Sequence, residues 1–224
     1  MKAWDISEVK ALLIHTRKVD FDFYFLLLLA ITHGLRVSEV INLRKCDFII
    51  VAGKWKLRVQ RLKGSLETTQ LLHHDPDPLL SADEVAPRFL QRLGTGDFLF
   101  FPEVQDREGQ QLRAVPPKNK KKGLTWAKKL VTVNDRDVLR FQVDRLVEKY
   151  CHAVGIGVDA RDNRDHIHCA KHTLGTMLAA ANRPILEIAK ALGHKNINSS
   201  AAYCGTTDEK ADTARDAAFA AAGK

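Results

Sequence analysis

The stretch FDFYFLLLLAI, residues 21–31, is apolar at nearly every position. A helix with apolar side chains on all sides must be buried, so we expect residues 21–32 to form a helix at the centre of the core. The longest apolar run, Phe23 to Ile31, is only about half as long as a bilayer-spanning helix needs to be. The stretch therefore predicts the core helix of a soluble globular protein rather than a membrane segment.

Further helices are predicted on both sides of this stretch. Before it, Asp5 and Glu8 have the spacing of a capping box, and apolar residues at helical intervals indicate an amphipathic helix over residues 6–17. After it, Gly34 interrupts the helical pattern and a short helix begins at Arg36. Arg36 therefore stands at a helix start, where a long cation can be directed into a cleft.

A small antiparallel sheet is predicted next. Residues 46–51 are rich in β-forming side chains, residues 55–60 alternate between apolar and polar, and LETTQLL (66–72) supplies a third strand. Turns at Gly53 and at Lys63 would connect the three strands.

The rest of the pattern is mainly helical. Helices are predicted near 82–93, from Asn134 or Asp135 to about Gly155, and over 168–182, 184–192 and 208–222. Between the first two lie an apolar segment, DFLFF (97–101), interpreted as a strand, and a polar loop rich in lysine. The expected fold class is mainly α with a small antiparallel β-sheet (α+β).

Composition narrows the cellular setting and the partner. The chain of 224 residues has a formal net charge of +8 and a pI of about 9.4, which favours a polyanionic partner but also fits an ordinary basic enzyme. The four cysteines are scattered without a CxxC pair, which indicates free thiols in a reducing, intracellular compartment. They are Cys46, Cys151, Cys169 and Cys204.

The segment KNKKKGLTWAKK, residues 118–129, carries six lysines and no acidic residue. One interpretation is a loop that follows the phosphates of a nucleic acid, and the other is an ordinary solvated loop. The candidate DNA-binding residues are Lys118, Lys120, Lys121, Lys122, Lys128 and Lys129.

Tyr203 is one of only three tyrosines, and it stands among small polar residues in ALGHKNINSSAAYCGTT, residues 191–207. Tyr24 and Tyr150 lie on regular apolar faces, as buried tyrosines usually do. Because the small polar residues around Tyr203 could not bury its ring, we expect an exposed side chain, which is either an ordinary surface ring or a reagent.

Four separated pieces of the chain resemble the catalytic domain of the tyrosine recombinases, the phage integrase family. THGLRVSEVINLRKCDF resembles the family's first box, and LKGS matches the turn that carries its mobile lysine. HIHCAKHTLGTMLA resembles the second box, normally His-x-x-Arg-His, and LGHKNINSSAAY matches Leu-Gly-His followed nine residues later by the nucleophilic tyrosine. The pieces follow the family's order and span nearly the whole chain.

The resemblance assigns a role to each matching residue. The implied catalytic residues are Arg36, Lys63, His168, Lys171, His194 and Tyr203, with Glu39 and His172 in support. One position departs from the family, because Lys171 stands where the second arginine is usual. Lysine offers a point charge in place of a planar fork that grips two phosphate oxygens, so full activity is in question.

The resemblance also implies a reaction. Tyr203 would attack a DNA phosphate to give a 3′-phosphotyrosyl link and a free 5′-hydroxyl, with Lys63 as the acid for the leaving oxygen. Cations placed around the phosphorus centre would stabilise its charge. Because the covalent link keeps the bond energy, the reaction needs neither ATP, nor a metal, nor another cofactor.

Partners and setting follow from the same resemblance. Residues 1–224 would form one catalytic domain, without the N-terminal core-binding domain common in the family. The expected partners are double-stranded DNA and further copies of the chain, as a dimer or tetramer on DNA, with the tail at 208–224 as a candidate for exchange between subunits. The expected location is the prokaryotic cytoplasm, in association with the nucleoid.

Three alternatives stay open at this point. A type IB topoisomerase uses the same chemistry on one duplex, and a DNA-binding relative could have lost catalysis through Lys171. His168 and His172, four residues apart beside His166 and Cys169, also suggest zinc. The zinc interpretation is disfavoured because no acidic residue lies between them and Lys171 would place a cation beside the metal.

Overall fold

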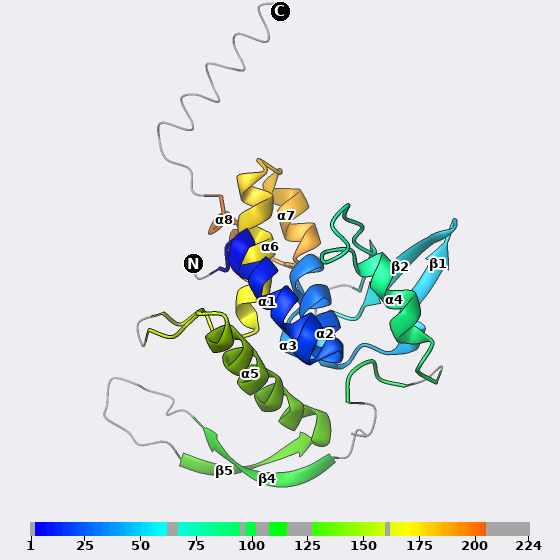
Figure 1. Cartoon of the computed structure of the whole chain (residues 1–224). Coiled ribbons are helices and arrows are strands. Elements are labelled where there is room, and N and C mark those ends of the chain that lie inside the picture. Colours follow the sequence, from blue (N-terminus) through cyan, green and yellow to red (C-terminus); the bar gives the residue numbers. More distant parts are fainter. Residues whose placement is uncertain are drawn as a thin grey trace, which may run out of the picture.

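The computed structural model describes residues 3–61, 67–94, 97–101, 108–115, 127–159 and 162–204 (Figure 1). In chain order the elements are α1 (Ile6–Val19), α2 (Phe21–Thr32), α3 (Val37–Ile41), η1 (Lys45–Asp47), β1 (Phe48–Val51), β2 (Lys54–Val59), β3 (Thr68–Leu71), α4 (Ala82–Leu90), β4 (Glu108–Val115), β5 (Ala127–Asn134), α5 (Asp135–Ala153), α6 (His168–Ala180), α7 (Ile185–Ala191) and α8 (Asn198–Ala201). The fold is mainly helical with small antiparallel sheets, as predicted.

The helix α2 forms the centre of the core. Every residue from Phe23 to Ile31 is buried, and α1, α3, α4 and α6 all contact α2. The capping box of Asp5 and Glu8 starts α1 as predicted. Just before it, the backbone N–H of Trp4 donates to Thr173 Oγ1 at 2.9 Å, which fastens the start of the chain to α6. No helix in the described part of the chain is both long and apolar enough to cross a membrane.

The predicted three-stranded sheet is present in the order β1-β2-β3, with antiparallel pairs. Leu57 on the central strand pairs with Phe48 on one side and Gln70 on the other. Leu57 and Val59 are buried and so turn one face of β2 toward the helices. Lys63 follows β2 in the sequence but lies outside the described residues.

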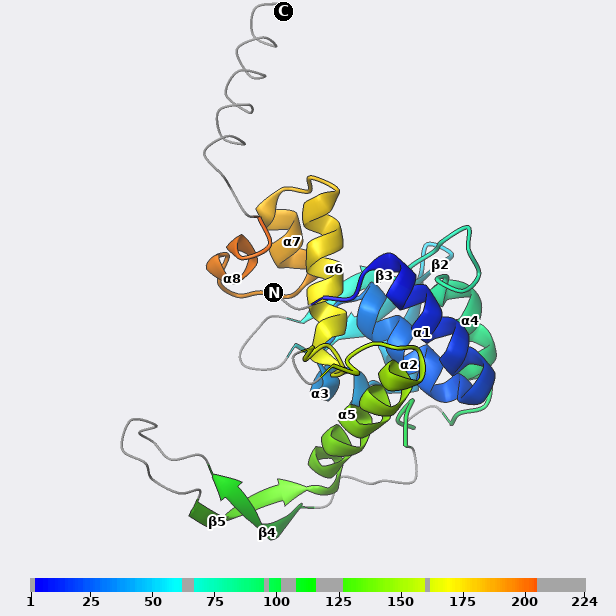
Figure 2. The same cartoon turned by 60° about the vertical axis from the view of Figure 1, so that its left-hand side comes forward.

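The lysine-rich segment differs from the prediction where it is described. Residues 127–134 form β5, which pairs with β4 in a second antiparallel sheet, so Lys128 and Lys129 belong to a strand and not to a loop. Figures 1 and 2 show this hairpin beyond the first turn of α5, apart from the three-stranded sheet. The other candidate lysines, Lys118, Lys120, Lys121 and Lys122, lie outside the described residues.

The apolar segment 97–101 is not a strand, because its one strand-like pairing is an isolated bridge between Arg44 and Phe98. Beyond this bridge, the segment bonds Arg136. Its guanidinium lies 3.5 Å from the centre of the Phe98 ring and donates to the Phe100 carbonyl at 3.0 Å. An arginine therefore bonds a carbonyl that a neighbouring strand would otherwise bond.

The C-terminal helices lie side by side at one end of the molecule (Figure 2). Asn134 caps α5, whose last turn runs into Gly155 as predicted, and α6 and α7 also agree with the prediction to within a few residues. The short helix α8 was not predicted. The alanine-rich helix predicted at 208–222 lies outside the described residues.

Candidate active site around Tyr203

Tyr203 follows the last turn of α8 and is half-buried, so the prediction of an exposed ring was wrong. Its hydroxyl lies 2.8 Å from Nδ1 of His172. Its ring stacks on the imidazole of His194 at a centroid distance of 6.4 Å and an interplanar angle of 14°. The tyrosine is thus held between residues of the third and fourth resembling pieces, His172 and His194.

Gly175 makes room for this ring. A Cβ atom at position 175 would lie 2.5 Å from Cε1 and 2.6 Å from Cζ of Tyr203. The ring therefore packs directly on the backbone of α6, where a larger residue would displace it. The sequence signal was available, because a glycine inside a helix costs stability and so indicates a packing requirement.

A ring nitrogen of His172 contacts the tyrosine hydroxyl, so the protonation state of this histidine matters for the site. Burial, together with the neighbouring His168 and His166, lowers the pKa of His172 to about 4, so the ring is neutral at physiological pH. Burial also raises the pKa of Tyr203, which keeps the phenol protonated in the absence of substrate. A neutral imidazole with its proton on Nε2 can accept the phenol proton at Nδ1.

His194 borders the tyrosine ring, and His168 borders the ring of His172. His168 is the first residue of α6, remains exposed, and meets the ring of His172 edge-on at 4.5 Å. His194 Nδ1 lies 2.8 Å from Ser200 Oγ on α8. Burial and the positive charges of Lys171 and Arg36 lower the pKa of His194 to about 4.

Lys171 lies beneath the site rather than at its surface. Its residue is only 1% exposed, and its Nζ donates to the Leu192 carbonyl at 2.5 Å. Burial, followed by the charge of Arg36, lowers its pKa to about 7. Lys171 therefore bonds the backbone at Leu192, and its contact with a phosphate oxygen stays a prediction.

Arg36 is the cation that faces outward. It is the N-cap residue of α3, its side chain is 25% exposed, and its Nη1 donates to Glu39 Oε1 at 2.8 Å. Glu39 is buried one turn later and also accepts from the backbone N–H of Arg36 at 2.9 Å. Although burial alone would raise the pKa of Glu39, the Arg36 N–H and the Arg61 charge outweigh it and lower that pKa.

Sequence reasoning missed Arg61. Its guanidinium is fully buried and pairs with Glu39 at 3.0 Å. The alternation along β2 could have indicated this, because Leu57, Val59 and Arg61 are two residues apart and share the inward face. A charged residue at an inward position calls for a buried partner, which Glu39 provides.

The structure therefore brings together most of the predicted site. Its described members are Arg36, Glu39, His168, Lys171, His172, His194 and Tyr203. Lys63 and Lys118 to Lys122 lie outside the described residues, and Lys128 and Lys129 are on β5, in the hairpin next to α5.

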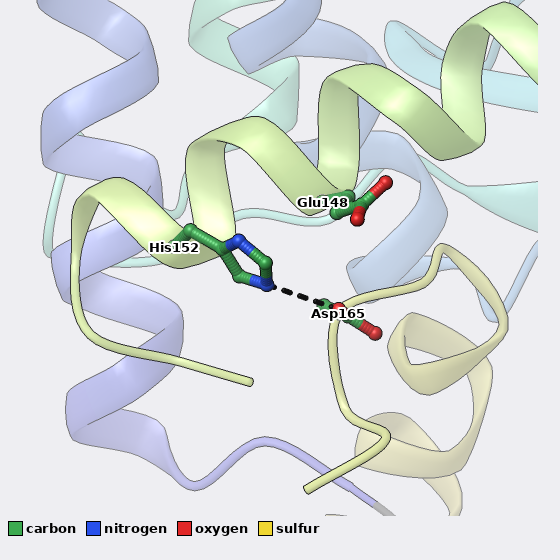
Figure 3. Close-up of side chains that lie close together, drawn as sticks. All are labelled: Glu148, His152 and Asp165. Carbon is green, nitrogen blue, oxygen red and sulfur yellow. Dashed lines mark hydrogen bonds and ion pairs between the residues drawn. The ribbon is translucent and has the colours of Figure 1, made fainter. Parts of the chain in front are cut away.

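A possible metal-binding group lies elsewhere. Within the described part of the chain, Glu148, His152 and Asp165 place one ligand atom each within 4.8 Å of one another (Figure 3). His152 Nε2 and Asp165 Oδ2 already pair at 3.1 Å, and two of the three residues are exposed. His168 and His172 are not part of this group.

Comparison with known proteins decides the family. The model of the phage integrase family matches residues 4–210. This chain belongs to the phage integrase family. A search of curated proteins finds no match.

Solved structures of tyrosine recombinases share the fold of this family member. XerH bound to its difH substrate in a pre-cleavage complex is 17% identical, with a TM-score of 0.64 over 96% of this chain and 54% of that chain. XerA recombinase is 16% identical, with a TM-score of 0.59 over 95% of this chain and 63% of that chain. The Tn1549 transposon integrase with circular intermediate DNA is 18% identical, with a TM-score of 0.57 over 96% of this chain and 66% of that chain. The present chain thus spans between half and two-thirds of these structures.

Proposed function

We propose that this family member cuts and rejoins DNA as a site-specific recombinase, through a 3′-phosphotyrosyl intermediate on Tyr203. The carrying observation is the 2.8 Å contact between the Tyr203 hydroxyl and Nδ1 of His172. A phenol is a weak nucleophile until a base takes its proton, and a neutral histidine in contact with it is such a base.

The proposed first step balances as follows. The Tyr203 oxygen forms a bond to phosphorus while His172 Nδ1 takes its proton, and the bond from phosphorus to the 5′-oxygen breaks. The leaving oxygen takes a proton from an acid, for which Lys63 is our candidate. In the second step a 5′-hydroxyl of the partner strand attacks the phosphotyrosine, and Tyr203 regains its proton. Each step exchanges one phosphodiester for another, so the chemistry calls for no ATP, metal or other cofactor.

Positive charge would stabilise the crowded phosphorus centre. Arg36 is held on one side by Glu39, and its side chain stays partly exposed, so that it could meet phosphate oxygens. His168 and His194 supply further donors. Lys171 would act from below, adding charge through the protein while its Nζ holds the Leu192 carbonyl.

The natural substrate would be double-stranded DNA. XerH and the Tn1549 integrase, which share this fold, were solved with DNA, and the net charge of +8 suits a polyanion. We extend the proposal to residues 1–224 as the catalytic domain, to a homo-oligomer on DNA with exchange of the 208–224 tail, and to the lysines of 118–129 as phosphate contacts. A prokaryotic setting close to the nucleoid goes with this proposal.

The test uses the chain with nicked duplexes. A pool carrying a randomised central segment, together with duplexes from the DNA that flanks the gene, is incubated with the chain and denatured with detergent. We expect adducts that survive denaturation and that disappear in Tyr203→Phe. Tight DNA binding without any adduct would overturn the proposal and identify a DNA-binding relative. Relaxation of supercoiled plasmids of any sequence would instead indicate a topoisomerase.

A further inference from the structure

Arg61 has an unusual position for a cation. Its guanidinium has no solvent exposure and is surrounded by acceptors from separate parts of the chain. It donates to Glu39 Oε2 at 3.0 Å, and to the carbonyls of His33 at 3.3 Å and Ala191 at 3.2 Å. The geometry fits arginine specifically, because one planar fork reaches an acid and carbonyls in different directions at once.

One side of this arrangement controls Arg36. Glu39 Oε2 accepts from both Arg61 and the backbone N–H of Arg36, while Oε1 accepts from the Arg36 side chain. Glu39 therefore bonds the side chains of two arginines with the two oxygens of one carboxylate. Without Arg61, Glu39 would lose the buried ion pair that holds its Oε2, and the direction of the Arg36 guanidinium would change with it.

The other side controls the turn that carries His194. Ala191 ends α7, and its carbonyl accepts from Gln70 Nε2 at 3.2 Å as well as from Arg61. Gly193 has a positive φ of 61°, and a Cβ atom there would lie 2.6 Å from Arg61 Nε. The backbone just before His194 therefore rests directly on the Arg61 side chain.

We propose that Arg61 is a positioning residue that fixes Arg36 and His194 relative to each other, and so sets the spacing that a phosphate meets. This inference rests on the proposed function, but it concerns a residue to which the family resemblance gives no role. Arg61 is buried and acts through Glu39 and the Ala191–Gly193 turn, without contact with the substrate.

The kinetic test compares Arg61→Met, Arg61→Lys and a matched control. Arg61→Met should lower the single-turnover cleavage rate about 100-fold, the loss expected when catalytic groups move by about an ångström. The Kd for DNA should be unchanged, because the side chain is buried. Arg61→Lys should recover part of the rate, since it keeps the charge but not the fork.

Arg136→Met is the control for mere loss of a buried arginine. Arg136 is equally buried and also donates to backbone carbonyls, those of Ile41 and Phe100, and the hydrogen bonds described for it go neither to Glu39 nor to the turn before His194. The folded fraction of Arg136→Met should cleave DNA at close to the native rate. Equal losses of rate per folded molecule in Arg61→Met and Arg136→Met would overturn the inference, as would a native rate in Arg61→Met.

A second readout does not depend on cleavage. The imidazole resonances of His194, followed by NMR in the DNA-free chain, should shift in Arg61→Met, whereas those of His152 at the end of α5 should not. Unchanged His194 resonances would contradict the positioning role even if the chain cleaved no DNA. A chain that shows the shift but forms no Tyr203 adduct would retain the positioning role and lose the proposed function.

Discussion

The two halves of the candidate site are held in different ways. Arg36 and its buried partners Glu39 and Arg61 form a network of ion pairs beneath the surface. Tyr203 is instead held by one hydrogen bond to His172 and by ring contacts, close to solvent. The difference suggests that the charges are preorganised, whereas the nucleophile is lightly held and can move toward a phosphate.

Breaking the network should have the largest effect. Glu39→Ala leaves Arg61 buried without its acid, so the free energy of unfolding should fall by about 3–5 kcal/mol. Urea unfolding measures this loss. Glu187→Ala, at an exposed position on α7, is the control and should change stability by less than about 0.5 kcal/mol. A loss no larger than that of the control would mean that the buried network does not hold this half of the site.

In the tyrosine half, Gly175→Ala should lower the cleavage rate without lowering the stability of the fold. Alanine favours a helix interior by up to about 1 kcal/mol over glycine, so α6 itself should not be weakened. The new Cβ would displace the Tyr203 ring, and single-turnover cleavage should fall about 100-fold. Thr176→Ala, at the adjacent exposed position, should leave cleavage unchanged. Native cleavage by Gly175→Ala would show that the ring does not need this seat on α6.

The pH dependence of cleavage should separate the charge of Lys171 from its packing. With a pKa of about 7, Lys171 is charged below this pH and loses its charge as the pH rises through it. At pH 6, Lys171→Met should therefore cleave about 10–100-fold more slowly than the native chain, the worth of one charge-assisted bond. Most of that difference should disappear at pH 8.5. A constant ratio across this range would assign Lys171 a packing role alone.

The smallest expected effect concerns His33, which lies behind the network. Burial lowers its pKa to about 4, while its Nδ1 lies 2.9 Å from Gln70 Oε1. Between about pH 6.5 and pH 4 the unfolded chain binds a proton that the folded chain does not, so stability falls as the pH falls.

The free energy of unfolding should change less steeply with pH in His33→Gln than in the native chain, by about 1.4 kcal/mol per pH unit. Urea unfolding at pH 7, 6 and 5 measures the slope. His74→Gln, at an exposed position, is the control for the substitution itself. An unchanged slope in His33→Gln would show that His33 takes up its proton without unfolding.

Strong local patterns made much of the fold predictable. The apolar run of α2 and the capping box of α1 leave few alternatives, and the alternation along β2 indicates its sheet. The hairpin β4–β5 was missed because its strands carry many polar and basic residues, which read as a loop. Segment 97–101 was misread because its backbone pairs only at the bridge with Arg44, and its last two carbonyls bond Arg136, which comes 35 residues after Phe101.

The sequence predicted which residues belong to the candidate site better than it predicted their burial and contacts. Motif spacing identified Arg36, His172 and Tyr203, which the fold does bring to one region. The burial of Tyr203 depends on the absent side chain of Gly175, and the burial of Lys171 on the carbonyl of Leu192. Such contacts between distant segments are not visible in local sequence patterns.

The central claim is that Tyr203 is the nucleophile, and mass spectrometry of the protein–DNA adduct tests it most directly. After nuclease and trypsin digestion, the peptide of residues 196–210 should carry the added nucleotide, with fragmentation placing it on Tyr203. His172→Ala should reduce the yield of this peptide adduct without moving it. A nucleotide on any other residue, or an adduct that persists in Tyr203→Phe, would contradict the account.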